Sequence, residues 1–272
     1  NHIAKKHTKS GTFILKEKKN ILDVLKKTNV GEIWGIGSRS AKLLNSYGIY
    51  NAFELISLDE SWIKRKLSIV GLRIVHELKG IKCFDLDNKK QIKKNICTSR
   101  SFGTPTSDYN HLSQAISTFA VRCSEKLRKQ QSSASTIKIF IYTNPFNPRQ
   151  KQYYGNITLK LDQATNDNQV MIQEALKGLK SIYKEEYIYK KAGVIVGNLI
   201  PTNQIQLNLF DDLNNRDKYK KISTIFDKIN NSMGKDKIRI AVQGFDRKWQ
   251  MKQEQLSPAY TTRIEEILTI KI

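Results

Sequence analysis

The sequence predicts an α+β protein of more than one domain, and three observations support this fold class. Apolar residues recur at helical spacing near 21–25 and over 53–81, on both sides of a glycine-hinged segment at 33–49. Residues 95–200 follow the order β-α-β-β-α-β, which is typical of two-layer domains with helices on one face of an antiparallel sheet. With 272 residues, the chain has room for two or three small domains.

The predicted helical domain covers 1–81. It contains a glycine-containing helix-hairpin-helix segment, a short apolar helical face near residues 21–25, and two further helices at 53–67 and 71–81. A lysine-rich stretch at 82–94 is expected to link this domain to the next.

The predicted two-layer domain covers 95–200, and a mixed tail region is expected over 201–272. In the tail, the pattern predicts a helix at 217–234 and a strand at 237–245. The strands and helices of the two-layer domain are expected at 95–103, 107–131, 135–144, 153–161, 168–183 and 189–200.

The chain is strongly basic, with 47 Lys and Arg against 25 Asp and Glu and a formal net charge of +22. Such an excess predicts a polyanionic partner, either nucleic acid or an acidic membrane surface. Because the sequence has no run of 18 apolar residues and no signal-peptide pattern, we expect nucleic acid, no membrane partner and a cytoplasmic, nucleoid-associated location. A genome-wide enrichment in lysine is the alternative explanation of the charge.

Metal and disulfide sites are not expected. The three cysteines, Cys83, Cys97 and Cys123, are far apart and form no CxxC pair. This pattern argues against structural zinc and a disulfide framework, and it predicts a reducing compartment. The four histidines do not cluster with acidic residues, so we expect no cofactor in this chain.

The segment IWGIGSRSAKLL contains the helix-hairpin-helix pattern h-x-G-I-G-x-x-x-A-x-x-L. Its two glycines allow a tight turn and a close approach to phosphate, and the next helix offers unpaired N–H groups and the positive end of its dipole. A plain turn between helices is the alternative, whereas a Rossmann or P-loop motif is excluded because no strand precedes the glycines. The expected DNA contacts are Gly35, Gly37, Ser38, Arg39, Ser40 and Lys42.

An acidic pair, Asp59-Glu60, resembles the adjacent carboxylates with which nucleotidyl transferases hold two metal ions. The pair lies between two helical patterns, so we expect Asp59 to cap the second helix. The other acidic pair, at 211–212, has no third carboxylate in view. We therefore expect no catalytic residue in this chain.

The first strand of the two-layer domain carries the sequence CTSRSFG. Alternation places Arg100 and Phe102 on one face, with Ser99 and Ser101 on the other. We expect a basic sheet face that includes Arg100 to lie along a DNA backbone, although an ordinary solvated face is the alternative. The expected contacts are Arg100 and Lys138, with Lys160 on the same face, together with hydroxyl and backbone N–H groups of Ser99, Ser101 and Gly103.

The segment QLNLF is an apolar cluster in polar surroundings. Leucine and phenylalanine side chains can fill an apolar pocket of a partner protein while a glutamine fixes the orientation by hydrogen bonding. The alternative is a strand or loop that packs onto the preceding domain. The candidate binding residues are Gln206, Leu207, Leu209 and Phe210.

In this order, the motifs resemble the C-terminal portion of a Y-family translesion DNA polymerase, most closely the UmuC-type subunit of DNA polymerase V. The resemblance implies that 1–81 is the end of the palm and the thumb, 95–200 is the little finger, and 201–272 is a clamp-binding motif with a UmuC-type C-terminal region. It also implies that the catalytic carboxylates, and the Mg²⁺ of the full-length polymerase, belong to a palm that precedes Asn1. The matching stretches are NHIAKKH, IWGIGSRSAKLL, ICTSRSFG, YYGN, KAGV, QLNLFDD and WQMKQEQLSPAYTTR.

The resemblance further implies the partners. It implies primer-template DNA, a sliding clamp bound by QLNLF, a processed UmuD-type dimer and RecA filaments in the SOS response. The expected function is the DNA- and clamp-binding portion of an error-prone polymerase that is inactive alone. The alternatives are a standalone adaptor or dominant-negative regulator, and a hairpin-type repair glycosylase that uses Asp59.

Overall fold

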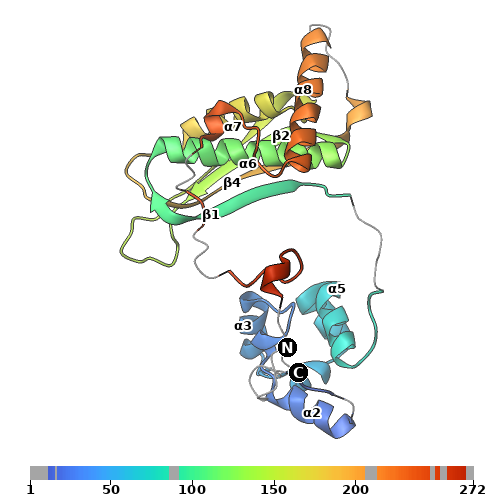
Figure 1. Ribbon diagram of the computed structural model, residues 1–272. Coiled ribbons are helices and arrows are strands. Elements are labelled where there is room, and N and C mark those ends of the chain that lie inside the picture. The colour runs from blue at the N-terminus through green and yellow to red at the C-terminus, as the bar shows by residue number, and fades with distance from the viewer. Residues whose placement is uncertain are drawn as a thin grey trace. The chain divides into compact units, whose positions relative to one another are not determined.

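The computed structural model describes residues 12–15, 17–85, 92–205, 213–245, 249–251 and 256–267, with the backbone alone at 213–217. The chain divides into two compact units, Asn1–Lys90 and Gln91–Ile272, and each has its own apolar core. The described part of the first unit is helical, and the second unit carries a sheet (Figure 1). The predicted α+β class is therefore confirmed.

The first unit is a small helical domain. Its core takes buried side chains from every helix and from the turn before the hairpin, among them Leu25, Val30, Leu44, Leu55 and Ile63. The elements are α2 (Lys18–Lys27), the 3₁₀ turn η1 (Val30–Glu32), α3 (Ser38–Ser46), α4 (Ala52–Ile56) and α5 (Glu60–Leu78).

A break between α4 and α5 corrects the predicted helix at 53–67. The carboxylate of Asp59 accepts the N–H of Trp62 at 3.0 Å, which starts a new helix at this point. The apolar spacing therefore runs across two helices. The second predicted helix, at 71–81, is the later part of α5, which continues past a non-helical residue, Ser68, with φ of 64°.

The second unit is a four-stranded antiparallel sheet with α6 and α7 on one face (Figure 1). The strand order is β1-β4-β2-β3, so β1 and β3 form the edges. The chain order confirms the predicted β-α-β-β-α-β motif. The elements are β1 (Ile96–Thr106), α6 (Tyr109–Lys129), β2 (Ser132–Tyr142), β3 (Tyr154–Thr165), α7 (Asn168–Ile182) and β4 (Tyr189–Pro201).

The two faces of this sheet have different compositions. The helix-covered face carries β-branched residues such as Ile139 and Val194, which are fully buried against apolar residues of α6 and α7 such as Ile116 and Leu179. This burial supplies the main stabilisation of the second unit. The other face is not covered by α6 or α7.

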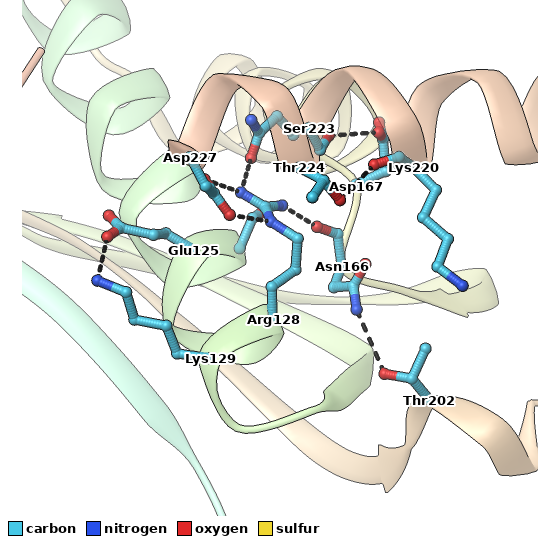
Figure 2. Close-up of polar contacts among 12 residues, drawn as sticks. Glu125, Arg128, Lys129, Asn166, Asp167, Thr202, Lys220, Ser223, Thr224 and Asp227 are labelled. Atoms are coloured by element: carbon cyan, nitrogen blue, oxygen red, sulfur yellow. Dashed lines mark hydrogen bonds and ion pairs between the residues drawn. The ribbon is translucent and has the colours of Figure 1, made fainter. Parts of the chain in front are cut away.

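The C-terminal region attaches to the second unit. Arg128, near the end of α6, donates two hydrogen bonds to Asp227 of α8 (Leu213–Ser232), at 2.6 and 2.8 Å (Figure 2). Ser223 of α8 donates to Oδ2 of Asp167 at 3.1 Å, while Oδ1 of the same carboxylate caps α7. Farther along, Trp249 packs edge-on against Phe119 of α6.

The predicted strand at 237–245 is wrong. This segment contains a 3₁₀ turn, η3 (Ala241–Gln243), which packs near α6. The N–H of Ile240 donates to the side-chain oxygen of Gln243 at 2.9 Å, so a local bond replaces the bond that a strand would make to a neighbour. Val242 packs against the core of the second unit, which explains the apolar alternation without a strand. Two more 3₁₀ turns are η2 (Thr202–Gln204) and η4 (Ile264–Glu266).

Candidate nucleic-acid interface

The hairpin begins with a tight turn over Ile33–Ile36. The N–H of Ile36 donates to the carbonyl of Ile33 at 3.1 Å. Gly35, the third residue of the turn, has φ of 96°, a conformation that favours glycine. Ile36 is buried in the core of the first unit, as predicted, and this anchors the turn. The local sequence thus fixes the entry to α3.

The start of α3 presents free backbone donors. Gly37 is its N-cap residue, with extended backbone, and no side chain in the described part of the chain caps the helix. The first N–H groups of α3, from Ser38 to Ser40, have no carbonyl partner within the helix. A Cβ built at Gly37 would meet nothing within 4 Å, so the approach to these donors is open. The geometry suits a phosphate or another small anionic group.

Basic and aromatic side chains surround this start. Arg39 and Lys42 are exposed on α3. Trp34, at the tip of the turn, is 96% exposed, which is unusual for so large an apolar side chain. The hairpin pattern assigns Trp34 no role, because any residue is allowed at its position.

The uncovered face of the sheet forms a second candidate surface. Directly paired residues point to the same face of an antiparallel sheet. Lys138 pairs with Thr158 and Ile195, and Thr136 pairs with Lys160. These side chains therefore share one face, opposite the helices. The register adds Ser99, Ser101, Tyr142, Tyr154, Lys191 and Gly193 to this surface, which we call the open sheet face.

Gly193 keeps part of the open sheet face flat. A Cβ at this position would lie 2.3 Å from the ring of Phe140 and 2.5 Å from Cβ of Ser99. Without that Cβ, the Phe140 ring lies over the strand and stacks on Tyr142, with ring centroids 5.9 Å apart. Lys191 in turn lies 5.7 Å from the centroid of Tyr142. The face thus combines aromatic rings with lysines, as nucleic-acid-binding surfaces do.

The predicted place of Arg100 needs correction. Arg100 pairs with Ala192, which also pairs with Ile141, a fully buried residue on the helix-covered side. Arg100 and Lys138 therefore lie on opposite faces, and alternation within one strand could not reveal this without the pairing register. Because β1 is an edge strand, Arg100 is still exposed, and it donates to its neighbour's carbonyl, that of Ser99.

The backbone of Gly103 is also not available as predicted. Its N–H donates to the carbonyl of Gln250 at 3.2 Å. The expectation that this N–H is open to a phosphate is therefore wrong, and the cause is a contact with the C-terminal region, more than a hundred residues away in the chain. Such a contact leaves no local signal in the sequence.

The acidic pair Asp59-Glu60 has a structural role. Asp59 caps α5 and also accepts a hydrogen bond from Ser61, and these bonds lower the pKa of its carboxyl group. Glu60 contacts His76 at 3.0 Å. Among the described residues, no three His, Cys, Asp or Glu side chains gather in a way that could hold a metal ion.

The segment QLNLF and the residue Cys123 are two further features of the sequence. The segment QLNLF, with Gln206, Leu207, Leu209 and Phe210, lies outside the described residues. Cys123 is buried, and burial raises the pKa of its thiol to about 11, so the group stays protonated at neutral pH. None of the helices in the described ranges is long and apolar enough to cross a membrane.

Three family models match the chain. The IMS family HHH motif matches residues 18–49, which include the hairpin. The impB/mucB/samB family C-terminal domain matches residues 93–209, the sheet domain. A domain of unknown function, DUF4113, matches residues 220–270, the C-terminal region.

Curated relatives agree with these matches. Protein UmuC of Salmonella typhimurium is 37% identical over 243 residues, which cover 89% of this chain and 57% of the relative. Protein MucB of Escherichia coli is 35% identical over 274 residues, covering 100% of this chain and 64% of the relative. DNA polymerase IV of Staphylococcus aureus is 23% identical over 192 residues, or 71% of this chain and 52% of the relative.

The helix-hairpin-helix domain, the four-stranded two-layer domain that follows it and these matches are consistent with the C-terminal portion of a Y-family, UmuC-type DNA polymerase. The sheet domain matches the impB/mucB/samB family C-terminal domain, and most of the chain is similar to UmuC-type proteins. The chain spans 57% to 65% of the length of the UmuC-type relatives that it matches.

Proposed function

We propose that this chain supplies the DNA grip and the clamp attachment of an error-prone translesion DNA polymerase in SOS mutagenesis. The observation that carries the proposal is the start of α3. There, Gly37 leaves an open approach to uncapped N–H groups, beside the exposed cations Arg39 and Lys42. This arrangement contacts phosphates without reading bases, which suits a polymerase that must follow any sequence.

The open sheet face would provide the second contact with DNA. Lys138, Lys160 and Lys191 can neutralise backbone phosphates, and the hydroxyls of Ser99 and Ser101 can donate to phosphate oxygens. Arg100 would add its charge from the sheet edge rather than from this face. Two separate phosphate-binding surfaces would hold the primer-template on both units of the chain.

The proposal places the nucleotidyl-transfer reaction in the palm of the full-length polymerase. The described residues offer no carboxylate cluster for Mg²⁺, and Asp59 is committed to capping α5. We therefore propose that this chain alone does not extend a primer. Its residues would position the duplex, while palm carboxylates of the full-length protein would bind the metal ions.

Further partners are proposed on the family resemblance. Gln206–Phe210 would bind a sliding clamp through its leucine and phenylalanine side chains. Weak affinity would suffice, because clamp and chain bind the same DNA and the local concentration is high. A processed UmuD-type dimer and RecA would contact the full-length protein. A standalone adaptor or dominant-negative regulator is the second candidate, and an upstream reading frame without palm carboxylates would favour it.

Salt dependence of duplex binding tests the DNA grip. If the chain neutralises about 4–6 phosphates, log affinity should fall with log salt at a slope of about −4 to −5. A slope near zero would contradict the proposal. Primer extension by the purified chain with Mg²⁺ would contradict the non-catalytic assignment.

Clamp attachment has its own test. Replacing Leu207, Leu209 and Phe210 with Ala should abolish co-purification with the sliding clamp while duplex affinity stays within about twofold of wild type, because the DNA surfaces lie elsewhere. Parallel loss of clamp binding, DNA binding and folded structure would identify these residues as core residues instead.

A further inference from the structure

A large cleft lies between α8 and one end of the sheet domain, and its lining shares no residue with the hairpin or the open sheet face. Its volume is about 1380 Å³. One wall is a face of α8, and the opposite wall comes from the segment that leads into β1 and from the end of β4. Because this volume exceeds the roughly 300–1,000 Å³ of usual small-molecule sites, the cleft has room for a segment of a polymer.

The α8 wall is held firmly in place. Arg128 and Asp227 form a bidentate ion pair, with side chains only 10% and 18% exposed. Arg128 also donates to the carbonyl of Asn166 (Figure 2). A further bond joins Arg128 to the side-chain oxygen of Asn168 at 3.1 Å. Both partners of this ion pair are nearly buried, so replacing either one would leave a buried charge unpaired, and the intact pair fixes α8 as a wall of the cleft.

The opposite wall is fixed by a side-chain amide. Gln130 accepts the N–H of Lys93 at 3.1 Å and donates to the carbonyl of Lys93 at 3.0 Å. This pair of bonds holds the chain that leads into β1 beside the end of α6. Lys93 and Lys94 therefore line the cleft at a defined position.

The lining has a clear excess of positive charge. Asp227 is its one carboxylate among the described residues, and Arg128 neutralises it. Lys129 pairs with Glu125 at 2.6 Å. Four other lining lysines have no ion-pair partner in the part of the chain that the structure describes: Lys93, Lys94, Lys220 and Lys228.

Amide side chains accompany these lysines. Asn198 lines the cleft in a left-handed conformation, with φ of 49°, which few residues other than glycine adopt and which asparagine tolerates best. It lies within β4 rather than at a helix end, so no helix cap accounts for it. Asn95, Asn203 and Asn231 add further donors and acceptors to the lining.

We infer that this cleft binds a segment of single-stranded nucleic acid, an inference that rests on the proposed function in DNA binding. The four lysines would contact phosphates, and the asparagine amides would bond to base edges, which a single strand exposes and a duplex confines to its grooves. Ile92, Ile200 and Pro201 provide apolar contacts for sugars and base faces. Since the described lining contains no aromatic ring, binding depends on charge more than on stacking.

Two charge-reversal variants of the full chain test this inference. Lys220→Glu/Lys228→Glu changes the cleft, whereas Lys218→Glu/Lys221→Glu makes the same charge change at exposed positions of α8 outside the lining. Fluorescence anisotropy measures binding to labelled oligothymidine and to a duplex of equal length. The cleft variant should bind oligothymidine about tenfold more weakly, with a salt slope shallower by about 1.4. Its duplex affinity, and both affinities of the control variant, should change less than threefold.

Every other outcome decides against the inference or against its premise. Equal losses in both variants would indicate general charge, and no loss in the cleft variant would exclude the site. Lys93→Glu/Lys94→Glu, on the opposite wall, must reproduce the loss with an unchanged circular dichroism spectrum. If the cleft variant keeps oligothymidine affinity but no longer binds polyglutamate, the ligand is an acidic peptide. A wild-type chain that binds duplex but not oligothymidine overturns only this inference, whereas failure to bind duplex overturns the proposed function.

Discussion

The hairpin and the open sheet face present phosphate-binding groups in different ways. The hairpin uses one short run, Ile33–Lys42, and its central donors are backbone N–H groups at the start of α3. The open sheet face collects single side chains from four strands, so Ser99, Lys138 and Lys160 meet only after the strands have paired. A backbone site can thus be predicted from local sequence, whereas a side-chain site on a sheet requires the register.

The largest expected effect is a loss of stability on replacing Gly35, one of the two hairpin glycines. Gly35→Ala should destabilise the first unit by about 1–3 kcal/mol, because Gly35 has φ of 96° and the new Cβ would lie 2.8 Å from Cδ1 of Ile74. Urea unfolding followed by circular dichroism measures this change. Gly37→Ala is the control: its Cβ meets nothing within 4 Å, so the poorer N-cap should cost about 1 kcal/mol or less, while the added methyl group at the open helix start should weaken duplex binding. Equal destabilisation by both changes would contradict the assigned roles.

The next effect tests the open sheet face. Lys138→Ala/Lys160→Ala should weaken duplex binding about thirtyfold and make the salt slope shallower by about 1.8, because two phosphate contacts are removed. Lys177→Ala/Lys180→Ala removes the same charge from exposed positions of α7, in the layer on the other side of the sheet. Titrations at several salt concentrations compare the variants. An equal loss for the α7 variant would mean that net charge, rather than the face, determines binding.

A smaller effect is expected at the tip of the hairpin. Trp34→Ala should weaken primer-template binding up to about tenfold, because an exposed indole can stack on a sugar or a base beside the bound phosphate. The unfolding midpoint should not change, since Trp34 is not part of the core. Quenching of tryptophan emission offers a second measurement in a Trp62→Phe/Trp249→Phe background, where DNA should protect the remaining indole. A lower unfolding midpoint for Trp34→Ala would show that the ring packs within the protein.

The smallest effect concerns the acidic pair. Asp59→Ala should lower the thermal midpoint by a few degrees without changing DNA binding, whereas Asp59→Asn should retain the cap. Because the folded state lowers the pKa of Asp59, its contribution is present above the ordinary carboxyl pKa and is lost as the pH falls below about 4. Scanning calorimetry from pH 7 to pH 3 should therefore show wild type losing stability relative to Asp59→Asn. Base release from damaged duplex that disappears in Asp59→Asn would instead favour the glycosylase alternative.

Much of the fold could be predicted from periodicity. The β-α-β-β-α-β order, the hairpin with Ile36 in the core, and the cap at Asp59 all depend on interactions within a few residues. The predicted strand at 237–245 was wrong because periodicity does not distinguish strand pairing from tertiary packing. Its alternation reflects packing of Val242 against the sheet domain, and the turn closes through the side chain of Gln243.

The candidate interface was predicted less completely, because tertiary contacts determine which of its side chains and N–H groups are available. The face of Arg100 depends on its pairing with Ala192, and the N–H of Gly103 is taken by Gln250. Trp34 carries a local signal that could have been used, since a large aromatic residue at the tip of a glycine turn has few places to be buried. The cleft beside α8 has no such signal, because its walls come from distant parts of the chain.

The carboxylate of Asp167 joins two elements that are otherwise distinct. One oxygen accepts the N–H groups of Gln169 and Val170 at the start of α7, and the other accepts the hydroxyl of Ser223 on α8. Docking of α8 and order in the first turn of α7 are therefore coupled. The amide protons of Gln169 and Val170 should exchange with deuterated solvent faster whenever α8 is released. The exchange rates of these two amides therefore measure the fraction of molecules in which α8 is docked on the sheet domain.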